Sequence, residues 1–377
     1  MRIGFSAARW QSGDAEDCKS SYTGSIPVRA SNLSIRFPSA LVPFLVCVCV
    51  LALSAFVPTP SRAADGLPPG MVEQSILVRG EKRVFLMFDG RAPAAGDAKA
   101  AMVIDLHGGG QSMWKAFEQP QSPNRRWLSL ARQHGFILLA PNGTDPRTGL
   151  SIAQTQHWND FRLDWPGRTF PPDDTAFLVA LAEWGVRSQN ADPARIYLTG
   201  ASNGGMMTFR GLIERPDVFA AAAAFIAVLP DRELPVPEAA RPMFLLNGTA
   251  DPVVPWNGRW LGRDLLGSTA DTLSYWLDIH GLSAPGAITQ IDEIGQGSGS
   301  EAPDCSTSEW VFGGTADAPL VRMVALRGGG HWLPSTWEWE PVPQLLEWLG
   351  PKCETIDGPL LAWEFLRNHR LALEKGK

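Results

Sequence analysis

The 377-residue sequence lacks the motifs of metal, nucleotide or nucleic-acid chemistry. It contains no His-Glu-x-x-His, no paired Cys-x-x-Cys and no acidic calcium loop, so no metal site is required. A phosphate-binding loop is also missing. No run of five or more Lys or Arg occurs, and the net charge is −6, which argues against nucleic acid as a partner. We therefore expect no metal, no cofactor and no nucleic acid.

Repeats and linkers are missing as well. No period of 20–50 residues is present, which excludes solenoids and propellers. No Ser/Thr/Pro-rich stretch separates a second module. The content of 45% hydrophobic and 19% charged residues is typical of a globular protein. We expect one domain, of the size typical of a catalytic domain, over residues 64–377.

Charge is absent from one long apolar run near the N-terminus, residues 40–57. Two arginines precede this run, and Ser61 and Ala63 follow it with the small-x-small spacing of a cleavage site. The pattern predicts a secretory signal peptide over residues 1–63, and hence an extracellular or periplasmic protein without a stable membrane anchor after cleavage. The polar stretch before Arg29 is atypical of a signal peptide and indicates a true start further downstream. A membrane anchor is the alternative, because the run is near the lower length limit for a span.

Cysteine is scarce. Three of the five cysteines fall within the predicted signal peptide, which leaves only Cys305 and Cys353. Two remaining cysteines in an exported chain predict a disulfide between them. The alternative is a pair of free buried thiols.

The rest of the chain alternates short apolar runs with amphipathic stretches. Residues 101–106 and 195–199 are examples of the runs, and 172–190 has the apolar spacing of a helix. Strands that are apolar on both faces and alternate with helices predict an α/β fold, with a mostly parallel central sheet covered by helices on both faces. In such sheets the functional residues lie in loops at the carboxyl ends of strands.

One such loop carries the sequence Gly-Ala-Ser-Asn-Gly over residues 200–204, between an expected strand and an expected helix. A nucleophile on a sharp strand-to-helix turn needs small neighbours, and Gly200 and Gly204 provide the room. The pattern Gly-x-Ser-x-Gly also occurs by chance in unrelated proteins. Its position directly after an expected strand is what makes it informative here. We predict that Ser202 is a nucleophile.

A serine nucleophile needs a base, and His331 follows another expected strand and a run of three glycines. Among the six histidines, His157 is its one serious rival. Asp251 follows a further strand and is the predicted carboxylate partner of the histidine. The order Ser202, Asp251, His331 is that of the α/β-hydrolase fold.

An oxyanion hole needs two backbone donors beside the nucleophile. The N–H of Asn203, at the expected helix start, is the predicted first donor. The second should come from the glycine loop after an earlier strand, where Gly109 is the first choice and Gly110 the second.

Fifteen tryptophans are many for this length. Indole rings suit flat or polymeric substrates, although about half of such residues belong in a core. Trp256 and Trp332 lie next to the predicted acid and base, and Trp158 lies in the aromatic stretch 154–170, a predicted substrate loop. We predict that these three tryptophans bind substrate.

Taken together, the stretches around Gly109, Ser202, Asp251 and His331 resemble the secreted polyhydroxybutyrate depolymerase and feruloyl-esterase-like group of α/β-hydrolases. The resemblance covers residues 74–370. It implies a serine esterase for small or oligomeric hydroxyalkanoate esters, with feruloyl or acetyl-xylan esters as the alternative. One departure is that members of this group carry a cysteine where this chain has Gly109, so a local disulfide there is lost.

Two other functions fit the same motifs less well. A serine peptidase of the prolyl-oligopeptidase kind shares the serine turn and the residue order, but it usually carries a large extra domain. A binding protein that kept the fold without catalysis would not need three intact catalytic positions. The oligomeric state stays open.

Overall fold

A computed structural model describes seven stretches of the chain: residues 66–92, 98–151, 155–162, 172–261, 264–295, 304–336 and 343–373. All of them lie within one compact unit, Pro58–Lys377. The predicted signal peptide, residues 1–63, lies outside the described residues. Within those seven stretches, no helix is both long and apolar enough to cross a membrane.

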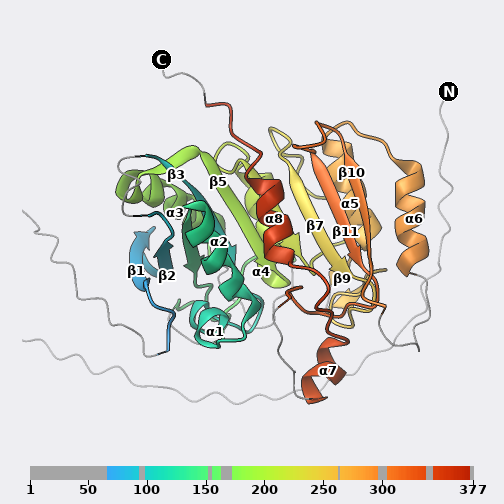
Figure 1. The fold of residues 1–377 in the computed structure, drawn as a ribbon, viewed down its shortest axis with the longest axis horizontal. Coiled ribbons are helices and arrows are strands. Elements are labelled where there is room, and N and C mark those ends of the chain that lie inside the picture. The colour runs from blue at the N-terminus through green and yellow to red at the C-terminus, as the bar shows by residue number, and fades with distance from the viewer. Residues whose placement is uncertain are drawn as a thin grey trace, which may run out of the picture. The chain divides into compact units, whose positions relative to one another are not determined.

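A nine-stranded sheet forms the centre of the unit (Figure 1). In spatial order its strands are β1 Met71–Val78, β2 Glu81–Asp89, β4 Ile137–Pro141, β3 Ala100–Leu106, β5 Ala191–Ala201, β6 Ala221–Phe225, β7 Met243–Gly248, β11 Val321–Leu326 and β10 Thr307–Phe312. The six strands from β4 to β11 are parallel, whereas β1, β2 and β10 pair antiparallel at the edges. A separate hairpin joins β8 Arg259–Leu261 to β9 Asp264–Leu266.

Helices cover both faces of the sheet, as the sequence predicted. One face carries α1 Met113–Glu118, the short 3-10 helix η2 Pro123–Arg125, α2 Arg126–His134 and α8 Gly358–Leu366. The other carries α3 Asp174–Gln189, α4 Asn203–Glu214, α5 Thr269–Ile279 and α6 Pro285–Gly295. Helix α7 spans Pro343–Leu349. This arrangement confirms the predicted α/β class.

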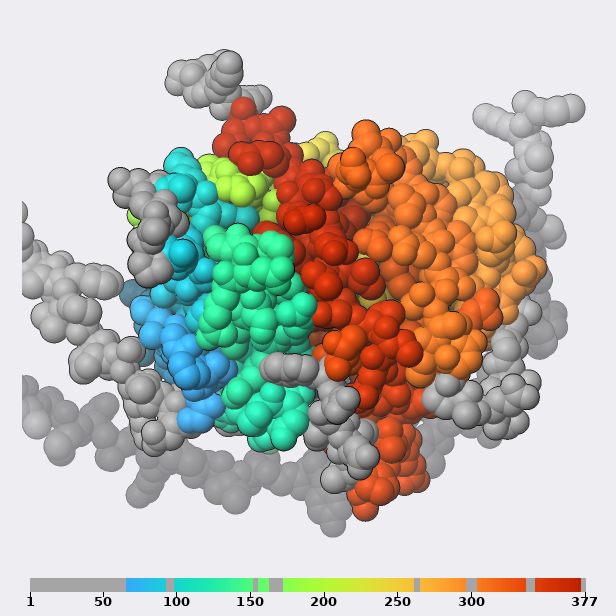
Figure 2. Space-filling model, viewed as in Figure 1, coloured from blue at the N-terminus to red at the C-terminus, as the bar shows by residue number. Residues whose placement is uncertain are grey.

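Two hydrophobic cores lie on the two sides of the sheet. Strand β3 shows why both form: Met102 and Ile104 point into one core, and Ala101 and Val103 into the other. On the second side, helices α2 and α8 lie next to each other, as Figure 2 shows in green and red. This side is closed by aromatic packing, because the ring of Trp363 on α8 lies 4.3 Å from that of Phe136, centroid to centroid.

The helix predicted over residues 172–190 is α3, and its ends explain its bounds. The carboxylate of Asp173 accepts the backbone N–H of Ala176 at 2.8 Å, which caps the first turn. Asn190 ends the helix in the left-handed conformation, with φ of 54°. No helix was predicted over residues 285–295, although Ile288, Ile291 and Ile294 of α6 recur there at helical spacing.

Candidate active site

Ser202 occupies the sharp turn between β5 and α4. Its backbone has φ of 56° and ψ of −126°, a conformation that costs a non-glycine residue about 1–3 kcal/mol. The Ser202 N–H donates to the carbonyl of Phe225 on β6 at 3.0 Å, so the neighbouring strand holds the turn. Such strain at an exposed strand end is typical of a serine nucleophile.

The glycines around Ser202 are required by close backbone contacts. A Cβ at Gly200 would lie 2.6 Å from the carbonyl oxygen of Gly204. A Cβ at Gly204 would lie 2.2 Å from the carbonyl oxygen of Leu106 and 2.5 Å from that of His107. The start of α4 therefore rests directly on the end of β3, which brings the glycine loop after β3 next to the serine.

His331 and Asp251 form a hydrogen-bonded chain with Ser202. The Ser202 hydroxyl lies 2.9 Å from Nε2 of His331, and Nδ1 of His331 lies 2.6 Å from Oδ2 of Asp251. In the tautomer that satisfies both bonds, Nδ1–H donates to the carboxylate and Nε2 accepts the serine proton. The other carboxylate oxygen of Asp251 accepts the N–H groups of Val253 and Val254, both at 2.8 Å.

The loops that carry the acid and the base are tied to each other. The N–H of Ala250 donates to the carbonyl of Gly329 at 2.9 Å. A Cβ at Gly248 would lie 2.2 Å from the same carbonyl oxygen, so the two loops touch where only glycine fits. The N–H of His331 donates to the carbonyl of Leu349 at 2.6 Å, which holds the histidine from its other side.

The predicted disulfide is present and lies close to this second anchor. Cys305 and Cys353 are joined across 48 residues of sequence. Two residues before Cys353, the carbonyl of Pro351 accepts the N–H of Gly330 at 2.7 Å. The disulfide thus keeps the chain segment that supports His331 attached to the edge of the sheet.

The two predicted oxyanion donors lie side by side. Asn203 is the first residue of α4, where a backbone N–H has no partner within the helix. A Cβ built on Gly109 would lie 3.3 Å from the Cβ of Asn203, and one on Gly108 would lie 3.8 Å from the Cβ of Ser202. The N–H of Gly110 donates to the carbonyl of Gln156 at 2.9 Å, which makes Gly110 the poorer choice.

His157, the other candidate for the base, lies beside the glycine loop. Its backbone pairs with Thr144 in both directions at 3.0 Å. Its ring lies against the glycine loop, because a Cβ on Gly109 would lie 3.1 Å from Nδ1 of His157. The structure thus puts His331, and not His157, in hydrogen-bond contact with the serine.

Two of the three predicted substrate tryptophans are wrong, because they are buried in the core. Trp158 is 1% exposed and its indole N–H donates to the carbonyl of His107 at 2.8 Å. Trp256 is 3% exposed and donates to the carbonyl of Ile291 on α6 at 2.9 Å. Their polar N–H groups satisfy loop carbonyls, so these side chains pack the loops. Trp332 is half-buried beside His331 and stays a prediction.

Two buried titratable groups near the glycine loop were not singled out by the sequence pattern. Burial lowers the pKa of His107 to about 4, and its Nε2 accepts the N–H of Gly143 at 3.0 Å. Burial raises the pKa of Asp105 to about 7, while the amide of Asn124 donates to it at 2.8 Å. A polar residue inside a strand that is otherwise apolar on both faces was the available signal for Asp105.

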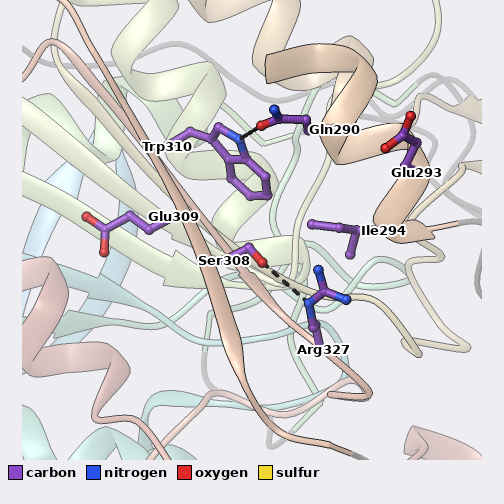
Figure 3. A pocket seen from close by; sticks show the side chains of 7 residues that line it. All are labelled: Gln290, Glu293, Ile294, Ser308, Glu309, Trp310 and Arg327. Atoms are coloured by element: carbon purple, nitrogen blue, oxygen red, sulfur yellow. Dashed lines mark hydrogen bonds between the residues drawn. The ribbon is translucent and has the colours of Figure 1, made fainter. Parts of the chain in front are cut away.

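A hollow lies between α6 and β10 (Figure 3). Its lining residues are Gln290, Glu293, Ile294, Ser308, Glu309, Trp310 and Arg327. The Trp310 indole donates to Gln290 at 3.1 Å, which fixes the ring. None of the predicted site residues lines this hollow. Over the part of the chain that is described, no three or more His, Cys, Asp or Glu side chains are grouped to hold a metal.

Comparison with known proteins connects this geometry to esterases. Residues 127–230 match the family described as Prolyl oligopeptidase family. The chain is 32% identical to Feruloyl esterase B of Neurospora crassa, over 34% of this chain and 40% of that protein. It is 29% identical to a poly(3-hydroxybutyrate) depolymerase of Ralstonia pickettii, over 46% of this chain and 35% of that protein.

A third relative is NocK of Nocardia uniformis, a protein named as an esterase. The identity is 35%, over 55% of this chain and 56% of that protein. The chain therefore spans between about a third and just over half of the length of these curated relatives. The strand order of the sheet is that of the α/β-hydrolase fold, and parts of the chain are similar to proteins named as esterases.

Proposed function

We propose that the chain is a serine hydrolase of carboxylic esters that acts through an acyl-enzyme. The observation that carries this proposal is the hydrogen-bonded chain from Ser202 through His331 to Asp251, at 2.9 and 2.6 Å. A serine hydroxyl is a weak nucleophile, and a histidine in this position accepts its proton as the oxygen attacks a carbonyl carbon.

The proposed reaction has two steps. Ser202 Oγ attacks the ester carbonyl while His331 Nε2 takes the hydroxyl proton, and the backbone N–H groups of Gly109 and Asn203 stabilise the oxyanion. His331 then gives the proton to the leaving alcohol, and the acyl group stays on the serine. A water molecule attacks the acyl-enzyme in the same way. Asp251 remains ionised and stabilises the imidazolium.

The proposed substrates are hydroxyalkanoate oligomers or related small esters, and feruloyl or acetyl-xylan esters are the second choice. Relatives named for each of these activities match parts of the chain. A flat aromatic acyl group would need an exposed aromatic side chain beside the serine. Since Trp158 and Trp256 are buried, Trp332 is the candidate for that contact.

One comparison makes peptides the alternative substrate class to exclude. The match to the prolyl oligopeptidase family includes Ser202 but neither Asp251 nor His331. A peptide bond needs the same nucleophile and base, so the geometry of these residues does not separate the two reactions. A chromogenic peptide belongs in the assay for this reason.

Export is part of the proposal. Residues 1–63 have the pattern of a signal peptide, and the Cys305–Cys353 disulfide is typical of an oxidising compartment. N-terminal sequencing of the exported protein would locate the cleavage site, which we expect after Ala63 or Ala64. A protein recovered only from the cytosol with its N-terminus intact would contradict export.

Rates on a soluble 3-hydroxybutyrate oligomer, methyl ferulate and a chromogenic peptide would test the function, with Ser202→Ala as the blank. We expect hydrolysis of at least one of the two esters, no peptide hydrolysis, and loss of activity in the variant. Preference for the oligomer would support the first choice of substrate, and preference for ferulate the second. Unchanged hydrolysis by Ser202→Ala would overturn the proposal.

A further inference from the structure

Residues 155–162 form a segment that connects the glycine loop to the nucleophile helix. At one end, the N–H of Gln156 donates to the carbonyl of Gln111 at 2.6 Å, and the N–H of Gly110 donates back to the carbonyl of Gln156 at 2.9 Å. The segment is thus paired to the loop that carries Gly109.

At its other end, the segment is held by the side chain of Asn203. Oδ1 of Asn203 accepts the N–H of Trp158 at 2.8 Å, and Nδ2 donates to the carbonyl of Trp158 at 3.1 Å and to Oδ2 of Asp160 at 2.7 Å. Both amide protons and the amide oxygen are therefore used. The same residue whose backbone N–H is the predicted oxyanion donor carries this contact.

Asp160 is itself oriented by an ion pair. Arg162 donates to both carboxylate oxygens through its side chain, at 2.7 to 3.0 Å, and to Oδ1 through its backbone N–H at 2.9 Å. The Asp160 and Arg162 side chains are 4% and 7% exposed, so solvent screens this pair weakly. The guanidinium of Arg210 on α4 donates to the carbonyl of Asn159 at 2.8 Å.

A second buried charge fixes the backbone next to Asp160. The carboxylate of Asp174 accepts the N–H of Asn159 at 2.7 Å and pairs with Arg83 at 2.7 Å. The indole of Trp158 donates to the carbonyl of His107, at the start of the glycine loop. The segment therefore cannot shift without moving both the glycine loop and the start of α4.

We propose that Asp160 is a positioning residue of the oxyanion hole. It accepts from the side chain of Asn203, the first residue of α4, and the same amide holds the backbone of Trp158, whose indole donates to the glycine loop. In this proposal these contacts hold the backbone N–H groups of Asn203 and Gly109 in place beside Ser202. This inference rests on the proposed function, because it concerns the hole in which the ester carbonyl would be bound.

The test is Asp160→Asn, which leaves one acceptor oxygen where Asn203 and Arg162 use two, and removes the charge that Arg162 pairs with. A misplacement of about 1 Å at an active site can cost roughly 100-fold in rate. We expect kcat, per active site titrated by an organophosphonate, to fall by about 10- to 100-fold with KM changed less than about threefold. A trifluoromethyl ketone, which forms an oxyanion on the serine, should bind more weakly by the same factor as kcat/KM falls.

Asp192→Asn is the matched control. Asp192 is a buried carboxylate that pairs with Arg195 at 2.8 Å and with Arg370 at 2.9 Å, and it accepts a backbone N–H two residues ahead. It lies at the start of β5, whereas Ser202 follows the end of that strand. We expect Asp192→Asn to lower the melting temperature but to keep kcat.

Three results would overturn the inference: unchanged kcat in Asp160→Asn, an equal loss in both variants, or unchanged inhibitor affinity. If Asp160→Asn does not fold, Asn203→Ala decides, because it keeps the backbone donor and removes all three side-chain bonds. Retained kcat in that variant would also overturn the inference. Ser202→Ala separates the two proposals. If this variant keeps its activity, the proposed function is refuted. If Ser202→Ala is inactive while Asp160→Asn is fully active, only the role of Asp160 is refuted.

Discussion

One added methyl group at Gly204 should damage catalysis directly. A Cβ there would lie 2.2 Å from the carbonyl oxygen of Leu106, and 2.5 Å from that of His107. Carbon and carbonyl oxygen normally approach to about 3.3 Å, so the start of α4 must move away by about 1 Å. That movement displaces both Ser202 and the N–H of Asn203.

A displacement of this size can lower kcat by about 100-fold, which is about 2.7 kcal/mol in the activation barrier. We also expect a loss of about 1–3 kcal/mol in the free energy of unfolding of Gly204→Ala, because backbone oxygens cannot rotate away as a side chain can. The assay is a burst titration with a chromogenic ester, followed by kcat per titrated site and a thermal melt.

Gly211→Ala on the same helix is the control. Its Cβ would lie 2.7 Å from Cδ1 of Leu198, the tip of a side chain, and Gly211 is more than two turns from Ser202. We expect Gly211→Ala to change stability but to keep kcat within about threefold. A Gly204→Ala protein with wild-type kcat would refute the argument that the contact with β3 positions the serine.

Three further predictions concern other parts of the molecule. Asp251→Asn should lower kcat about 10⁴-fold at an unchanged fold, because the amide favours the wrong histidine tautomer, and a fall of less than tenfold would remove Asp251 from the proposed site. Asp105 has a raised pKa of about 7 in the folded protein, whereas in the unfolded chain it loses its proton near pH 4. The free energy of unfolding should therefore fall as the pH rises from about 4 to about 7. The melting temperature of Asp105→Asn relative to wild type should therefore rise from pH 5 to pH 8, and a constant difference would contradict this pKa. Cys353→Ser removes the disulfide that joins two cysteines 48 residues apart, and it should lower the free energy of unfolding by about 4 kcal/mol in a denaturant titration. A loss below about 1 kcal/mol would contradict this prediction.

Much of the fold follows from local patterns in the sequence. Strands such as β3 are apolar on both faces, which only a sheet covered on both sides can accommodate. The ends of α3 follow from Asp173 and Asn190, whose side chains or backbone favour helix boundaries. Ser202 was predicted from its glycines because the crowding at a strand-to-helix turn depends on residues close to it in sequence.

The remainder depends on contacts between distant segments. A tryptophan near Asp251 in sequence could line a cleft or pack a loop, and only the position of α6 puts Trp256 in the core. The use of the Asn203 side chain as an anchor for Trp158 and Asp160 joins residues more than 40 positions apart. No periodicity or spacing in one sequence encodes such a pairing.

The central claim is that Ser202 is the nucleophile of an ester hydrolase, and covalent labelling tests it most directly. The purified protein would be treated with a fluorophosphonate, and intact mass, peptide mapping and residual esterase activity would be followed together. We predict one adduct per chain, located on Ser202, with activity lost in proportion to labelling and no adduct in Ser202→Ala. An adduct on another residue that abolishes activity, or full activity in a protein completely labelled at Ser202, would contradict the claim.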